Sequence, residues 1–365
     1  MEYRRLGSSG TVVSALALGT MTFGSETDEA GSFAQLDGFV EAGGTLVDTA
    51  DVYSGGASEE IIGRWLAQRP AEVRERVVIA TKGRFPTSAE PNGVGLSRRH
   101  LRRALDASLR RLGVDCVDLY QVHAFDALSP LEETLGCLDD LVREGKVHYV
   151  GLSNFTGWQL QRAVDLAEHL HLASRPVTLQ PQYSLLVREI EWELVPACAA
   201  AGIGILPWSP LGGGWLTGKY RRDETPTGAT RLGENPERGM EAYGPRSREE
   251  RTWRIIDAVR DVASSRGVSL SQVALAWLME RPAVTSVILG ARTLDQLADN
   301  LRAAELHLSE DEISRLDEAS TIPIGDYPYG PLGVEQRHRK LGGGRGRKVP
   351  GRGRRSEAPA RRGAE

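Results

Sequence analysis

The chain has 365 residues, of which 40% are hydrophobic and 26% charged, with 45 basic and 49 acidic side chains. This composition is typical of a globular protein and excludes wholesale disorder, a collagen-like repeat and a disulfide scaffold. At this length we expect either two average domains or one large α/β barrel. The three cysteines lack metal-ligand spacing, and no signal peptide or membrane-spanning helix is predicted, which favours a cytoplasmic protein.

Strand-like segments dominate the pattern from the N-terminus onward. Residues 2–16 predict a hairpin of two short strands around a Gly/Ser turn. Eight apolar, β-branched runs follow, and seven of them have the continuous apolar character of parallel strands buried on both faces. These runs are residues 14–20, 44–50, 76–82, 117–123, 148–154, 177–183, 202–209 and 286–291.

Amphipathic stretches between these runs predict helices. Ser97 occupies an N-cap position and Pro130 suits a first helical turn, while Gly113 and Gly145 follow predicted helix ends. The predicted helices are residues 58–68, 97–113, 130–145, 158–170, 189–201, 249–266, 269–281, 293–303 and 309–319.

Eight strands with intervening helices favour a closed (β/α)8 barrel in one domain, residues 1–333. An open doubly wound sheet is the competing architecture. The Gly/Pro-rich stretch 211–245 is too long for an ordinary connection and is typical of a lid or binding loop.

The remaining segment, 334–365, is an Arg/Gly-rich tail with almost no large apolar residue, so we expect it to be disordered. Eleven basic and two acidic residues from Gln336 onward give +9, which leaves −13 for the rest of the chain. Such a tail attracts polyanions, including nucleic acid. No aromatic residue is interleaved with its arginines, however, so a solvated tail without a fixed partner is the simpler interpretation.

Polar side chains stand where most of the predicted strands end. In a (β/α)8 barrel these ends meet at one rim, where active sites form. Each residue alone has an ordinary structural explanation, but their joint position predicts an active site. The strand-end residues are Thr20, Asp48, Lys82, His123, Ser153, Asn154, Gln180, Trp208, Ser209 and Gly290.

Three of these strand-end residues make chemical sense together with Tyr53, which lies in the loop after the first of them. The set is Asp48, Tyr53, Lys82 and His123. A tyrosine with a pKa near ~10 is a poor acid at neutral pH, and a nearby ammonium such as that of Lys82 lowers this pKa. Asp48 would keep the lysine charged, and His123 could orient a carbonyl oxygen. The set predicts a general acid for an oxygen that becomes negative as hydride adds to its carbon. None of the four donates hydride well, so a cofactor must supply it.

Several motifs in sequence order give the chain a resemblance to the aldo-keto reductase superfamily over about residues 2–320. It resembles most the branch that contains bacterial reductases and potassium-channel β-subunits, with similarity to actinobacterial ketoreductases of nucleotide-activated deoxysugars. The resemblance implies a (β/α)8 barrel, NADPH and reversible reduction of aldehydes or ketones. The motifs are LGTMTFG (18–24), VDTADVYSGGASEEIIGRWL (47–66), IATK (79–82), DLYQVH (118–123), VGLSNF (150–155), LQPQYSLL (179–186), LPWSPLGGGWLTGKY (206–220) and LGARTLDQLADN (289–300).

Carried over by motif, the resemblance implies a catalytic tetrad of Asp48, Tyr53, Lys82 and His123, with Tyr53 as proton donor. It also implies three groups of cofactor-binding residues. Around the nicotinamide these are Ser153, Asn154, Gln180, Trp208, Thr20 and Met21. Over the pyrophosphate they are Ser209, Leu211, Gly213 and Lys219. At the adenosine end they are Gly290, Arg292, Gln296 and Asn300.

Arg292 is the candidate for the 2′-phosphate, because a guanidinium suits a bidentate phosphate contact; a solvated surface arginine is the alternative. No GxGxxG follows an early strand, which argues against a Rossmann dehydrogenase. The tetrad lacks metal-ligand spacing, which disfavours a zinc enzyme, so we expect no metal. Asp299 departs from the glutamate that the branch often carries.

His123 favours carbonyl reduction over C=C reduction, since a few steroid double-bond reductases of the family carry glutamate there. Phe23, Phe85, Phe125 and Trp215 are candidates for the pocket wall or for ordinary packing. We expect an NADPH-dependent reductase of a small-molecule carbonyl compound, with a keto sugar as one candidate, and no membrane partner. The alternative is an NADP(H)-binding regulatory subunit with little turnover. Oligomeric state and reaction direction stay open.

Overall fold

The computed structural model describes residues 1–228, 230–237 and 239–337. The chain divides into two compact units, Met1–Ile322 and Pro323–Glu365. In the described part of the second unit lies the helix α14 (Pro331–Arg337). The domain end expected at Gly333 falls inside this helix. The tail from residue 338 onward lies outside the described residues, so its expected disorder stays a prediction.

Eight parallel strands form one sheet in the first unit, in the order β10-β3-β4-β5-β6-β7-β8-β9. Each of them lies within one of the eight predicted runs or within one residue of it. The strands are β3 (Leu16–Gly19), β4 (Leu46–Asp48), β5 (Val78–Gly83), β6 (Val117–Val122), β7 (Val147–Ser153), β8 (Pro176–Gln180), β9 (Gly204–Ile205) and β10 (Val287–Leu289).

The two end strands of this sheet approach each other and close it. Ile205 of β9 donates its N–H to the Ala283 carbonyl oxygen at 2.7 Å, and Thr285 donates to the Ile205 carbonyl oxygen at 2.9 Å. Ile205 and Val284 also form a parallel bridge just before β10. The architecture is therefore the expected (β/α)8 barrel, and the open doubly wound sheet is excluded.

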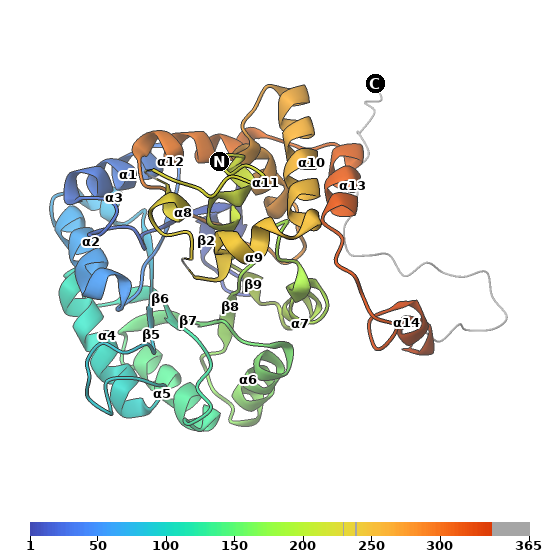
Figure 1. Ribbon diagram of the computed structural model, residues 1–365. Helices are drawn as coiled ribbons and strands as arrows, with labels where there is room; N and C mark the ends of the chain where they lie inside the picture. Colours follow the sequence, from blue (N-terminus) through green and yellow to red (C-terminus); the bar gives the residue numbers. More distant parts are fainter. Residues whose placement is uncertain (229, 238, 338–365) are drawn as a thin grey trace, which may run out of the picture. The chain divides into compact units, whose positions relative to one another are not determined.

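Helices surround the strands (Figure 1), and all nine predicted helical segments contain one. The segment 189–201 is divided into a short 3-10 turn, η2 (Glu189–Glu191), and α7. The helices are α2 (Ala57–Ala67), α4 (Arg98–Leu112), α5 (Leu131–Arg143), α6 (Gly157–His169), α7 (Leu194–Ala201), α10 (Glu250–Arg266), α11 (Leu270–Met279), α12 (Leu294–Leu301) and α13 (Glu310–Ala319).

Two further helices, α1 (Glu29–Glu41) and α3 (Ala71–Arg74), were not predicted from the sequence. In α1 the glycines Gly31 and Gly38 weaken the local helical signal. Tertiary packing favours glycine there, since a Cβ on Gly38 would lie 3.0 Å from Leu294 Cδ1 of α12.

The predicted helix ends are confirmed at three of four positions. Ser97 caps α4 by accepting the His100 N–H, and Gly113 and Gly145 adopt φ values of 66° and 75° after α4 and α5. Pro130 stands at the N-cap of α5, one residue before the first turn.

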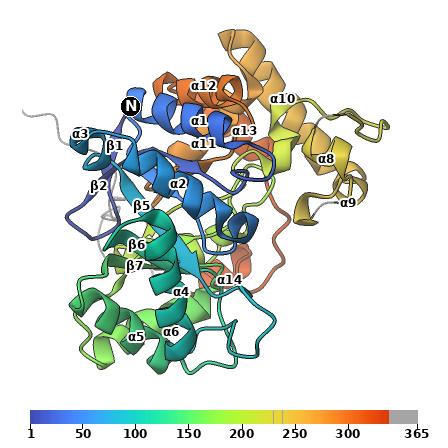
Figure 2. The ribbon, with the colours of Figure 1, turned by 90° about the vertical axis from the view of Figure 1, so that its left-hand side faces the viewer.

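The N-terminal hairpin, β1 (Tyr3–Arg5) and β2 (Val12–Ser14), is present as predicted. Leu6 and Val13 from this hairpin pack with the residues that fill the barrel interior, among them Leu46 and Leu119. The helices α8 (Arg231–Glu234) and α9 (Tyr243–Ser247) belong to the stretch that leaves the carboxyl end of β9. Figure 2 shows the hairpin and these two helices on opposite sides of the barrel. The strand ends that carry polar residues therefore face away from the hairpin.

Stretch 211–245 contains several short helical elements. Trp215 is fully buried there and stacks on Tyr243 with ring centroids 5.4 Å apart, which makes it a packing residue, as is the fully buried Phe23. The elements are η3 (Gly212–Thr217), α8 (Arg231–Glu234), η4 (Gly239–Glu241) and α9 (Tyr243–Ser247). Among the described residues, no helix is both long and apolar enough to cross a membrane.

Candidate active site

Three neighbouring barrel strands bring the predicted acid–base residues together. Asp48 ends β4, Lys82 lies near the end of β5, and His123 follows β6 directly. Because these strands are parallel and adjacent, their carboxyl ends meet at one rim. The arrangement places a carboxylate, an ammonium and an imidazole within one polar cluster.

The buried Lys82–Asp48 ion pair is the centre of this cluster. Lys82 Nζ donates to Asp48 Oδ2 at 2.6 Å and to the Thr49 carbonyl oxygen at 2.8 Å. The side chains are 0% and 2% exposed. A buried ammonium needs such partners, since an unpaired charge in this environment would be strongly unfavourable.

Tyr53 reaches the pair from the turn η1 (Tyr53–Gly56) after β4. Its Oη accepts the third hydrogen bond of Lys82 Nζ, at 3.3 Å. Ser54 and Gly55 adopt φ values of 50° and 66°, so the turn has an unusual backbone that aims the tyrosine inward. The Ser54 hydroxyl donates to the Phe23 carbonyl oxygen at 2.7 Å and holds this turn.

Burial and charge act in opposite directions on the two proton-carrying groups. Burial raises the pKa of Tyr53, and the Lys82 ammonium offsets only part of this rise, so the net shift is upward and not downward as the sequence suggested. Burial alone would lower the pKa of Lys82, but Asp48 and Tyr53 raise it above its ordinary value. Tyr53 and Lys82 are therefore both protonated at neutral pH.

His123 is a neutral side chain in this environment. Burial, together with the Lys82 and Arg84 cations, lowers its pKa to about 2. Its ring lies edge-on to Tyr53, with centroids 5.8 Å apart, and 4.6 Å from that of Phe85. The buried Nδ1 has no hydrogen-bond partner among the described residues. A neutral imidazole beside the phenol can donate one hydrogen bond to a substrate oxygen.

Next to the tetrad, strands β7 to β9 supply a second polar group. Ser153 Oγ donates to the Gln180 carbonyl oxygen at 2.8 Å, and Asn154 Nδ2 donates to the His123 carbonyl oxygen at 2.9 Å. Trp208 Nε1 donates to Asn154 Oδ1 at 3.0 Å. The four residues expected around a nicotinamide amide are thus held together at the same rim.

Thr20 and Met21, expected on the other side of the ring, differ in exposure. Thr20 is fully buried, and its hydroxyl donates to the Asp48 carbonyl oxygen at 3.0 Å and lies 2.8 Å from Ser58 Oγ. Met21 is 41% exposed, so its side chain is open to a ligand. Thr20 therefore positions the strand ends, and its hydroxyl is already committed to protein partners.

Stretch 211–245 begins with a glycine turn of unusual backbone shape. Ser209 has a φ of 51°, and Gly212, Gly213 and Gly214 have φ values of 56°, 65° and 100°. The φ of 100° favours glycine at position 214, and a Cβ there would lie 2.6 Å from Lys219 Nζ, so the lysine side chain would have to shift. The turn brings the end of the Lys219 side chain against the backbone at Gly214, and Leu211, which precedes the glycines, is half-buried.

Three cations gather where the pyrophosphate and adenosine ends were expected. Burial lowers the pKa of Lys219, and the nearby Arg292 and Arg231 lower it further. Arg231 was not singled out from the sequence, because nothing in its local pattern shows that α8 carries it next to Lys219. Like charges in a partly buried group are costly in the absence of an anion, which is typical of a phosphate site.

In this structure the Arg292 guanidinium forms ion pairs with two acidic side chains. Its Nε lies 3.0 Å from Glu26 Oε2, and its NH2 lies 2.8 Å from Glu234 Oε2. Its backbone N–H donates to Gln296 Oε1 at 3.0 Å. The arginine is thus no isolated surface residue.

The other residues expected at the adenosine end lie on or near α12. Asn300 is 4% exposed, whereas Gly290 and Gln296 are exposed. Asp299 accepts hydrogen bonds from Ser269 Oγ and Gln272 Nε2, both at 2.7 Å. Its carboxylate is therefore held by α11 and its N-cap.

Asp51 is a second feature that the sequence reasoning missed. It is 2% exposed, and neither carboxylate oxygen has a hydrogen-bond partner among the described residues. Burial and the Glu59 carboxylate raise its pKa to about 7. It lines a cavity of about 290 Å³ together with His100 and Arg103. The sequence shows the motif DTADVY around Asp51. It does not show that the Asp51 carboxylate lacks a hydrogen-bond partner, because this depends on residues distant in the sequence.

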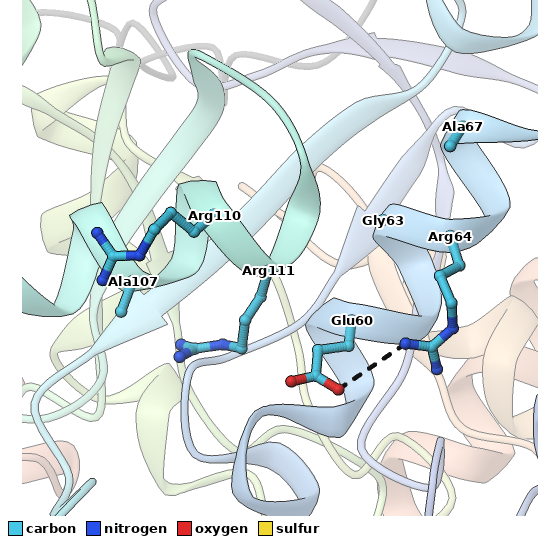
Figure 3. A pocket seen from close by; sticks show the side chains of 7 residues that line it. All are labelled: Glu60, Gly63, Arg64, Ala67, Ala107, Arg110 and Arg111. Carbon is cyan, nitrogen blue, oxygen red and sulfur yellow. Dashed lines mark ion pairs between the residues drawn. The ribbon is translucent and has the colours of Figure 1, made fainter.

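A cavity of about 400 Å³ lies on the outer surface between α2 and α4 (Figure 3). The figure shows the Glu60–Arg64 ion pair of α2, 3.8 Å between Oε2 and NH1, with Arg110 and Arg111 on α4. Small residues create the space, and none of the predicted site residues lines it. The lining residues are Glu60, Gly63, Arg64, Ala67, Ala107, Arg110 and Arg111.

Comparison with known proteins agrees with this geometry. The model of the aldo/keto reductase family matches residues 15–321. An uncharacterized oxidoreductase of Bacillus subtilis, YrpG, is 37% identical, over 90% of this chain and 98% of its own. A probable voltage-gated potassium channel subunit beta of Oryza sativa is 36% identical, over 84% of this chain and 92% of its own length. A versiconal hemiacetal acetate reductase of Aspergillus parasiticus is 34% identical, over 87% of this chain and 96% of its own length.

The matched region contains the whole barrel and every residue of the candidate site. The chain belongs to the aldo/keto reductase family, whose members are oxidoreductases of carbonyl groups that generally use NADH or NADPH.

Proposed function

We propose that this protein is an NADPH-dependent carbonyl reductase with Tyr53 as the proton donor. The observation that carries the proposal is the position of Lys82 Nζ, 2.6 Å from Asp48 Oδ2 and 3.3 Å from Tyr53 Oη. A phenol beside a buried ammonium is a proton source whose conjugate base is stabilised as it forms.

The residues divide the work as follows. Tyr53 transfers its Oη proton to the substrate oxygen as charge develops there, while Lys82 stabilises the phenolate that remains. Asp48 keeps Lys82 charged and oriented. Neutral His123 orients the carbonyl oxygen toward the phenol, and burial excludes water from the ion pair.

The chain's residues fit a nicotinamide cofactor. The glycine turn and the crowded cations Lys219, Arg231 and Arg292 suit phosphate groups. Ser153, Asn154 and Gln180 would hold the carboxamide, and Trp208 would pack on the ring, opposite Thr20 and Met21. Ser209, Leu211 and Gly213 would cover the pyrophosphate, and Gly290, Gln296 and Asn300 would line the adenosine end. The bound cofactor supplies the hydride.

NADPH is proposed over NADH because Arg292 can exchange its carboxylate partners for a 2′-phosphate. Arg292 NH2 donates to both Glu234 Oε1 and Oε2, each at 2.8 Å, and Arg292 Nε lies 3.0 Å from Glu26 Oε2. Two nitrogens of the guanidinium thus face acidic oxygens, and the same two nitrogens could bind two oxygens of a phosphate. For the substrate we propose a small-molecule carbonyl compound, with nucleotide-linked keto sugars as one class to test.

A regulatory subunit with little turnover is the second candidate, favoured by the potassium-channel β-subunit among the relatives. The two functions differ in turnover. Purified protein should oxidise NADPH in the presence of at least one member of a panel of aromatic aldehydes, small diketones and nucleotide-linked keto sugars. Tight NADPH binding with no turnover on any member, together with stable co-purification of a partner, would support the regulatory role.

A further inference from the structure

We propose that Gln121 is a positioning residue for Asp48, which it holds through a hydrogen bond that leaves Gln180 available to the cofactor. This inference rests on the proposed function. Three donors converge on the Asp48 carboxylate: Lys82 on Oδ2 at 2.6 Å, and on Oδ1 Gln180 Nε2 at 2.8 Å and Gln121 Nε2 at 3.3 Å.

The two amides that share Asp48 Oδ1 have different surroundings. Gln180 ends β8 beside Ser153, in the group proposed to bind the nicotinamide carboxamide. Gln121 lies inside β6, is 0% exposed, and donates to Asp48 alone among the described residues. When a carboxamide competes for the Gln180 amide, Gln121 is the donor that the cofactor does not engage.

The Gln121 amide is retained in the barrel interior at a cost to stability. Its Oε1 is buried and has no hydrogen-bond partner among the described residues. An apolar side chain of equal size would avoid this cost. A residue kept only for packing would therefore be replaced with no loss, whereas a residue that orients Asp48 would not.

The proton-transfer consequence follows from the charges around Tyr53. A donor on Oδ1 disperses the negative charge of Asp48. Without this donor, Asp48 attracts the Lys82 ammonium more strongly, so Lys82 stabilises the Tyr53 phenolate less and the phenol becomes a weaker acid. The titratable groups that face Tyr53 are Lys82, Asp48, Asp51 and His123.

The test compares Gln121→Met with Gln35→Met as a matched control. Gln35, in α1, is likewise 0% exposed, and both its amide atoms lack hydrogen-bond partners among the described residues. Gln121→Met should lower kcat about tenfold, the size of one hydrogen bond to a charged group. In a plot of the carbonyl reduction rate against pH, the decrease on the alkaline side should also move to higher pH. NADPH binding should change less than about twofold, and the cofactor-free variant should melt at or above the wild-type temperature.

Gln35→Met should raise or preserve the melting temperature and leave both kcat and the pH profile unchanged. Three results would overturn the proposal. Gln121→Met could keep the wild-type kcat and pH–rate profile, or Gln35→Met could lower kcat as much as Gln121→Met does. Gln121→Met could also melt well below the wild-type temperature. Should Gln121→Met fail to fold, Gln121→Asn keeps an amide but shortens its reach, and it must show the same shift.

A titration without turnover separates this inference from the proposed function. The ultraviolet difference between each protein and its Tyr53→Phe version reports the Tyr53 phenol alone. We expect the midpoint pH of the Tyr53 titration to rise in Gln121→Met and to stay unchanged in Gln35→Met. Absence of turnover in the wild type would defeat the proposed function, while an unchanged midpoint would defeat the role of Gln121.

Discussion

The tetrad end of the site and the proposed phosphate end are built in different ways. At the tetrad end, Lys82 has all three of its donor directions filled by groups of the barrel rim. At the phosphate end, Arg292 is held by Glu26 and by Glu234 of α8, 58 positions before it. The first cluster is complete in the protein itself, whereas the second holds acidic groups where an anionic ligand would bind.

This difference separates two kinds of work. Chemistry requires groups fixed before the substrate arrives, and adjacent barrel strands supply that rigidity. Cofactor binding requires exchange, and an ion pair with an exposed partner, such as Arg292–Glu234, is weak enough to be exchanged. Substitutions at the first end should therefore affect turnover and stability strongly, and those at the second end should affect cofactor affinity moderately.

The largest effect is expected from Lys82→Met. It leaves the Asp48 carboxylate buried without its cation, which should cost about 3–5 kcal/mol of unfolding free energy. Turnover should fall by about a thousandfold or more, because the phenolate loses its stabilising charge. Denaturant unfolding and NADPH oxidation would measure both. The double variant with Asp48→Asn should regain stability but not turnover; recovery of turnover would show that the pair is only structural.

Asp51→Asn should stabilise the protein in a pH-dependent manner. The pKa of Asp51 is raised from 3.8 to about 7, so its contribution to stability is intact below about pH 4 and is lost as the pH rises through 7. Asparagine does not ionise, so the variant should exceed wild type by up to about 4 kcal/mol at pH 8. At pH 4 the two should agree. An equal gain at both pH values would mean that titration of Asp51 is not its cause.

Arg292→Ala tests the phosphate end. It should weaken NADPH binding about 10- to 100-fold, as expected for the loss of a bidentate charged contact, and should leave NADH nearly unaffected. Fluorescence titration with both cofactors, and turnover at saturating NADPH, would provide the comparison. Equal losses for the two cofactors would show that Arg292 does not recognise the 2′-phosphate.

Glu234→Gln should give the smallest effect. The carboxylate is 44% exposed, and an exposed ion pair contributes at most about 1 kcal/mol. Freeing Arg292 from it should tighten NADPH binding by no more than about fivefold. Weaker binding in the variant would instead identify Glu234 as a group that holds α8 over the bound cofactor.

The same contrast explains which features the sequence could predict. The strands and the caps at Ser97 and Gly113 depend on local pattern, and the strand-end rule placed Asp48, Lys82 and His123 together. Helix α1 was missed because Gly31 and Gly38 weaken its local helical signal, and only the packing of Gly38 against Leu294 of α12 explains one of them.

Features that depend on distant neighbours could not be predicted. The orphan carboxylate of Asp51, the two amides on Asp48 Oδ1 and the acidic partners of Arg292 arise only when separate segments meet. The upward net shift of the Tyr53 pKa has the same origin, since burial is a property of the fold and not of the motif.

The most direct test of the account is a paired measurement on wild type and Tyr53→Phe. Turnover is measured as NADPH oxidation with a carbonyl substrate, and NADPH affinity is measured by fluorescence on the same preparations. We predict that the variant loses turnover by about a thousandfold or more while its NADPH affinity stays within about twofold. Turnover that survives the loss of this hydroxyl would contradict the assignment of Tyr53 as the proton donor.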